Sequence, residues 1–109
     1  MVRYGMGRLE EAVLLAVVRL GAKGYGVTIR RDVNERLGGG ERSFGAIYSS
    51  LERLEAKGFI SSKLGKPTPE RGGKPKRFYK IEAPGVRALA DAHTGVVNVW
   101  AGLPAGAPA

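Results

Sequence analysis

The sequence predicts a mainly α-helical domain that carries one small β-hairpin. Three observations predict it: helical segments with stop signals up to Gly58, a change to alternating spacing after Gly58, and a return to helical spacing from Ala83. The chain has 109 residues, of which 43% are hydrophobic, and this length and composition are typical of one packed domain.

The first predicted helix covers residues 9–20 and ends before Gly21. Its apolar residues form two faces, one made of Leu9, Val13, Ala16, Val17 and Leu20 and the other of Leu14, Leu15 and Val18. A helix with two apolar faces is either a central core helix or a helix whose second face meets another subunit. The sequence leaves both interpretations open.

A second helix is predicted from about Tyr25 to Leu37, where three glycines stop it, and a third follows Ser43 and runs to Gly58. The core stripe of the third helix is Ile47, Leu51 and Leu54, so its outward surface near the N-terminal end is small and polar. Small residues let a helix backbone approach the DNA major groove, and hydroxyls bond phosphates or base edges.

Several side chains on these two helices are candidate DNA contacts. They are Arg30 and Arg31 on the second helix, and Ser43, Gly45, Tyr48, Ser49 and Arg53 on the third. Arg53 is suited to a phosphate or a guanine. Tyr48 either bonds a phosphate or packs as a half-buried ring on the second helix.

Residues 59–64 and 76–81 are predicted strands, with Gly72 and Gly73 as the turn of a hairpin. Between Lys63 and Lys80 lie seven of the 18 Lys and Arg residues of the chain. The net charge of +8 predicts a polyanionic partner, namely DNA, RNA or an anionic membrane surface. A charge run is usually a solvated face, but its position after a helix–turn–helix pattern favours nucleic acid.

Other chemistries find little support in the composition. The chain has no cysteine and one histidine, His93, so neither a disulfide nor a zinc site is expected. No catalytic triad, Walker motif or dinucleotide fingerprint is present, so we expect neither an enzyme nor a cofactor. The chain also lacks an export signal and the run of about 20 apolar residues that spans a bilayer, and we expect a cytoplasmic protein.

The last predicted helix covers residues 83–100. Its positions Val86, Leu89, His93, Val96 and Trp100 follow the 3, 4, 3, 4 spacing of helices that pack on helices. The spacing covers barely two heptads, and it supports a homodimer when it is combined with the two-faced first helix and with the family resemblance given below. The predicted interface residues are Leu9, Val13, Leu14, Val17, Leu89, His93, Val96 and Trp100.

Trp100 and His93 each have a second interpretation. Trp100 either anchors the dimer or stacks on a planar effector in a pocket between subunits. His93 is either an interfacial hydrogen-bonding residue or a pH sensor.

The segments "YGVTIRRDV", "SFGAIYSSLERLEAKGFI" and "PERGGKPKRFYKIEAPGVRAL" resemble the PadR family of bacterial transcription regulators, over about residues 9–89. The resemblance implies a winged helix–turn–helix domain, for which we expect residues 1–82, followed by a dimerisation helix over residues 83–101. The composition of residues 102–109 predicts a flexible tail. It also implies a homodimer that binds an inverted-repeat operator in double-stranded DNA, usually as a repressor. Some members respond to a small aromatic effector.

By this resemblance the third helix is the recognition helix and the hairpin is the wing. The implied wing contacts are Arg71, Gly72, Gly73, Lys74, Lys76 and Arg77. Two residues depart from the family pattern. Phe44 is bulkier than the aliphatic residue often found there, and Glu82 replaces a threonine that often caps the last helix. A winged-helix module for protein–protein contacts and an aromatic-ligand sensor without strong DNA specificity are the alternatives.

Overall fold

The structure is a computed structural model that describes residues 5–66 and 75–104. Its elements are, in chain order, α1 (Arg8–Leu20), the short 3-10 helix η1 (Gly21–Lys23), α2 (Gly26–Leu37), α3 (Phe44–Ala56), β1 (Ile60–Leu64), β2 (Arg77–Ile81) and α4 (Ala83–Trp100). The predicted fold, mainly α-helical with one hairpin and a C-terminal helix, is confirmed, and each predicted element end lies within two residues of the observed one.

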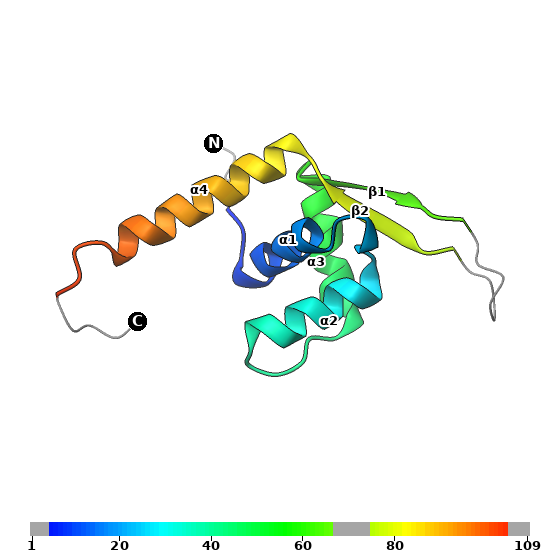
Figure 1. The fold of residues 1–109 in the computed structure, drawn as a ribbon, viewed down its shortest axis with the longest axis horizontal. Coiled ribbons are helices and arrows are strands. Elements are labelled where there is room, and N and C mark those ends of the chain that lie inside the picture. Colours follow the sequence, from blue (N-terminus) through cyan, green and yellow to red (C-terminus); the bar gives the residue numbers. More distant parts are fainter. Residues whose placement is uncertain (1–4, 67–74, 105–109) are drawn as a thin grey trace.

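The helices α1, α2 and α3 form a body from which the hairpin and α4 project in opposite directions (Figure 1). Its centre is α1, which contacts α2, α3, β2 and α4. The buried apolar core is made of Val13, Leu14, Ala16, Val17, Ile29, Val33, Ile47, Leu51, Leu54, Phe59, Ile60 and Tyr79. The core-helix interpretation of α1 therefore accounts for most of its apolar residues.

Three of the predicted dimer contacts are corrected by this packing. Val13, Leu14 and Val17 are at most 1% exposed within the chain itself, so their side chains have no surface to offer a second subunit. The reason is that α2 and α3 both pack against α1 and together cover more than one of its sides. The apolar residues of α1 that stay exposed are Leu15 and Val18.

The third helix begins and ends as its local sequence predicts. The Ala46 amide donates to Ser43 Oγ at 3.1 Å, so Ser43 is the N-cap. After the last turn, Gly58 takes a φ of +77°, a left-handed conformation that favours glycine. The Phe59 amide then donates to the Leu54 carbonyl at 3.0 Å, and the chain turns directly into β1.

The hairpin is fixed to the helical body at its base. The strands β1 and β2 pair antiparallel from Ile60↔Ile81 to Leu64↔Arg77. On its other side, β2 meets the segment before α2, because the Tyr79 amide donates to the Gly24 carbonyl at 2.9 Å. The rings of Tyr25 and Phe78 also meet edge to face, with centroids 5.5 Å apart. The predicted turn at Gly72 and Gly73 lies outside the described residues.

Within the described residues, the last helix is anchored to the helical body through its first half. Gly85 is its one buried residue, and every residue of α4 from His93 onward is exposed. Glu82, the N-cap residue, makes no side-chain cap bond, and its carboxylate instead accepts a hydrogen bond from Ser61 Oγ at 2.5 Å. Glu82 thus links the start of α4 to β1. Across residues 5–66 and 75–104, none of the helices has the length and apolar character that a bilayer span requires.

Candidate nucleic-acid interface

The N-terminal part of α3 presents a small polar surface, as predicted. Ser43, Gly45 and Ser49 are all exposed, whereas Ile47 faces the core and is fully buried. Phe44 and Tyr48 flank the three small residues and are also exposed. We call these five exposed residues the α3 surface.

Tyr48 packs on the second helix and still reaches solvent. Its hydroxyl lies over Gly26 of α2 so closely that a Cβ atom on Gly26 would clash with it. The ring stacks on Phe44 with centroids 6.4 Å apart and an interplanar angle of 25°. With 42% of the residue exposed, Tyr48 remains a candidate for a phosphate contact.

Arg53, in contrast, is held by groups of its own chain. Its Nε donates to Glu10 Oε2 at 2.5 Å and Nη2 donates to Ser50 Oγ at 3.3 Å. Lys57 donates to the other oxygen of Glu10 at 2.8 Å, so one carboxylate of α1 holds two cations from α3 and its C-cap. Arg53 also lies about 15 Å along the helix from Ser43. The structure therefore gives Arg53 a clear role in joining α1 to α3 and separates it from the α3 surface.

The sequence-based interpretation overlooked Glu10. Glu10 is 8% exposed, and it shares the i, i+3, i+4, i+7 face of Val13, Leu14 and Val17. A lone carboxylate on an otherwise apolar helix face was the available signal, because such a group requires a partner. Burial raises the pKa of Glu10, but hydrogen bonds from Lys57 and Arg53 outweigh it and hold the pKa below the ordinary value of 4.5.

We expect Glu10→Gln to lower the free energy of unfolding by about 1–3 kcal/mol at pH 7, because two cations lose a charged acceptor. A carboxylate whose pKa is lower in the folded state stabilises the fold at pH values above its ordinary pKa of 4.5. This contribution is lost as the pH falls through the folded pKa. The difference between wild type and variant should therefore shrink below about pH 4.5 in urea titrations. The exposed Glu52→Gln is the control, expected within about 0.5 kcal/mol of wild type. A difference that is constant from pH 7 to about pH 3 would contradict the assignment.

Of the two predicted arginines on α2, Arg30 supports the turn before α3. Its Nε donates to the Arg42 carbonyl at 2.7 Å, and its guanidinium carbon lies 4.5 Å from the centroid of the Phe44 ring. Asn34 assists, because its Oδ1 accepts from the Arg42 amide at 2.8 Å. Arg31 is exposed on the same helix.

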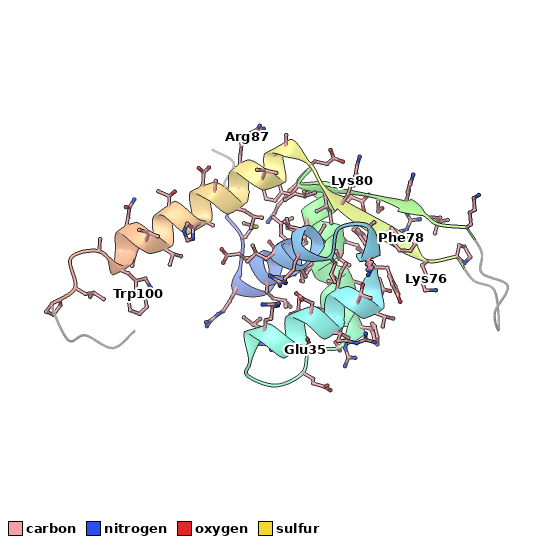
Figure 2. The ribbon with its side chains drawn as sticks, viewed as in Figure 1. Glu35, Lys76, Phe78, Lys80, Arg87 and Trp100 are labelled. Atoms are coloured by element: carbon pink, nitrogen blue, oxygen red, sulfur yellow. The ribbon has the colours of Figure 1, made fainter. Side chains whose placement is uncertain are left out.

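The described part of the wing combines anchored and exposed cations. Lys76 Nζ lies 5.4 Å from the centroid of the Tyr25 ring, and Arg77 Nη1 donates to Ser62 Oγ at 3.1 Å. Lys63 and Lys80 are exposed, and Figure 2 shows Lys76 and Lys80 on either side of Phe78 along the same arm of the hairpin. The predicted contacts Arg71, Gly72, Gly73 and Lys74 lie outside the described residues.

The wing and the α3 surface share the beginning of α2 as a common neighbour. Tyr25, the N-cap of α2, lies against Lys76 and Phe78 of the wing, and the next residue, Gly26, lies against Tyr48 of α3. The two candidate contact regions are thus joined through two consecutive residues. Three helices followed by a two-stranded wing define a winged-helix domain.

Comparison with known proteins places the chain within this class. Residues 14–91 match the family described as "Transcriptional regulator PadR-like family", and the chain belongs to that family. The family is one of transcriptional regulators, not of enzymes. A comparison with curated proteins finds no matching sequence.

Solved structures of similar fold agree with this assignment. A PadR family transcription regulator from Clostridium difficile has a TM-score of 0.69 and 21% identity, over 85% of this chain and 91% of that one. A PadR-like transcription factor from Bacteroides fragilis has a TM-score of 0.67 and 20% identity, over 84% of this chain and 82% of that one. Bacillus subtilis PadR, solved in complex with operator DNA, has a TM-score of 0.64 and 26% identity, over 78% of this chain and 46% of that one.

Proposed function

We propose that this chain is a sequence-specific, double-stranded DNA-binding regulator that acts as a homodimer, and as a repressor, at an inverted-repeat operator. The observation that carries the proposal is the α3 surface, with its exposed small polar residues joined to a cationic wing through Tyr25 and Gly26. Exposed hydroxyls and a close backbone suit the major groove, and the wing cations suit the flanking phosphates. The operator complex of the relative from Bacillus subtilis supports the same interpretation.

The dimer is supported by apolar surface that the chain leaves uncovered. On α4 the exposed large apolar residues are Val86, Val96, Val97, Val99 and Trp100. Leu15 and Val18 of α1 are exposed as well. Because a helix with this much exposed apolar surface gains stability from a partner, we assign these residues, with Leu9, Leu89 and His93 of the predicted interface, to the contact between subunits.

A site for an aromatic effector at Trp100 depends on where this side chain lies. Trp100 is 51% exposed and lies at the far end of α4, away from the helical body (Figure 2). We assign any pocket around its ring to the contact with the proposed second subunit. Such a site would depend on the proposed dimer, which makes the dimer the first property to test.

Selection of bound duplexes from a random pool tests the proposed function. We expect an inverted repeat whose half-sites are centred about 34 Å apart, because two recognition helices related by a two-fold axis enter successive major grooves. The affinity for this duplex should fall steeply with salt, since each phosphate contact releases a counterion. Binding without any consensus sequence would instead favour the alternative role as a protein-docking module.

A further inference from the structure

The start of α3 carries two neighbouring aromatic residues that are not buried. Phe44 and Tyr48 are each 42% exposed, and their rings stack on each other. Phe44 is the first residue of α3, directly after the N-cap Ser43. The exposed apolar surface of Phe44 therefore lies at the end of the recognition helix from which bases are read.

The Phe44 ring is held on two sides, although it is not part of the core. Tyr48 stacks against it from the next turn of α3, and the guanidinium of Arg30 lies over it at 4.5 Å. Arg30 is itself fixed by its hydrogen bond to the Arg42 carbonyl, and Arg30 Nη2 lies 3.7 Å from a carboxylate oxygen of Glu41. A ring held in this way presents an apolar surface at little conformational cost when a ligand meets it.

The chemistry of the Phe44 ring and of its neighbours determines which chemical group of DNA the ring can contact. Ser43 and Gly45, which precede and follow Phe44 in the chain, are small, so the stacked rings of Phe44 and Tyr48 are the bulky features of the α3 surface. A phenyl ring forms no hydrogen bond with a phosphate or a polar base edge. The C5-methyl group of thymine is the apolar group that a base pair presents in the major groove, and phenylalanine is among the side chains that contact it.

We propose that Phe44 is a specificity-determining residue that contacts the C5-methyl group of one thymine in each half-site, with Arg30 and Tyr48 holding its ring in place. This inference rests on the proposed function, because it requires that α3 enters the major groove. It assigns a particular base preference to an exposed ring at the first position of α3.

The test compares wild type with Phe44→Ala on the duplex that wild type selects, with each thymine replaced in turn by deoxyuridine, which lacks only the methyl group. At one thymine in each half-site, replacement by deoxyuridine should lower the affinity of wild type about three- to fivefold for each methyl group removed. Phe44→Ala should bind the thymine duplex more weakly and lose nothing further on that replacement. Phe44→Leu, which keeps an apolar side chain, should retain part of the dependence and guards against a folding defect.

Equal losses for wild type and Phe44→Ala at every thymine would overturn the inference while leaving the proposed function in place. A wild-type affinity that changes on none of the replacements would also overturn the inference and leave the proposed function in place. A failure of wild type to select any preferred duplex would overturn the proposed function and this inference together. The two failures are therefore distinguishable within one set of binding measurements.

Discussion

Gly85→Ala is expected to lower the free energy of unfolding by about 1–3 kcal/mol, the usual cost of forcing extra volume into a packed site. A Cβ atom at this position would clash with the Phe59 carbonyl oxygen and would lie 3.0 Å from Ile81 Cγ1. The first of these neighbours is backbone at the junction between α3 and β1, so it cannot rotate away as a side chain would. The strain would therefore act where α4 is anchored to the helical body.

The same helix offers a matched control. At Gly95 an added Cβ atom would have no neighbour within 4 Å, so Gly95→Ala should stabilise the helix by about 0.5–1 kcal/mol through helix propensity alone. Urea unfolding of both variants at one protein concentration measures the difference, since a dimer makes the transition concentration-dependent. Equal stability of the two variants would mean that α4 does not pack closely at Gly85.

Trp100→Ala is expected to weaken the dimer by about 2 kcal/mol or more, which is roughly a 30-fold increase in its Kd. Trp100 is half-exposed in the single chain and ends the α4 stripe, which is made of Val86, Leu89, His93, Val96 and Trp100. Its burial therefore depends on a partner. Sedimentation equilibrium measures the change. Asn98→Ala, on the same helix but off this stripe, is the control and should leave the dimer Kd nearly unchanged.

The same variant links the dimer to DNA binding. A weaker dimer should lose affinity for the full inverted repeat, because both half-sites contribute only when two subunits are joined. Affinity for a duplex with one half-site should change little, because α3 and the wing are far from Trp100 (Figure 2). An unchanged dimer Kd, or a wild-type protein that sediments as a monomer, would refute the interface on α4.

Much of the local structure was predictable from short-range signals. Ser43 caps α3, and the glycines at positions 21, 38 and 58 follow α1, α2 and α3 where the helical spacing stops. The core stripe of α3 was also predictable, because periodicity states which residues share a helix face. The family resemblance added the assignment of the hairpin as a wing, which spacing alone does not provide.

The roles of individual charged residues were less predictable. The DNA contact predicted for Arg53 stays a prediction, but its pairing with Glu10, a residue 43 positions earlier in the chain, was not foreseen. The same holds for Arg30, whose contacts with the Arg42 carbonyl and the Phe44 ring were not foreseen. Both side chains are long and flexible, so their partners depend on which elements happen to lie within reach.

Short-range patterns were sufficient to place the helices and strands, and to show the cationic character of the wing and the small polar residues at the start of α3. Tertiary packing was needed to show that Val13, Leu14 and Val17 belong to the chain's own core and that Leu15 and Val18 stay on its surface. Periodicity identifies the apolar sides of α1. Which of these sides are covered depends on the elements that pack against α1, namely α2, α3, β2 and α4. For the same physical reason, we assign the exposed apolar residues of α4 to the contact with the proposed second subunit.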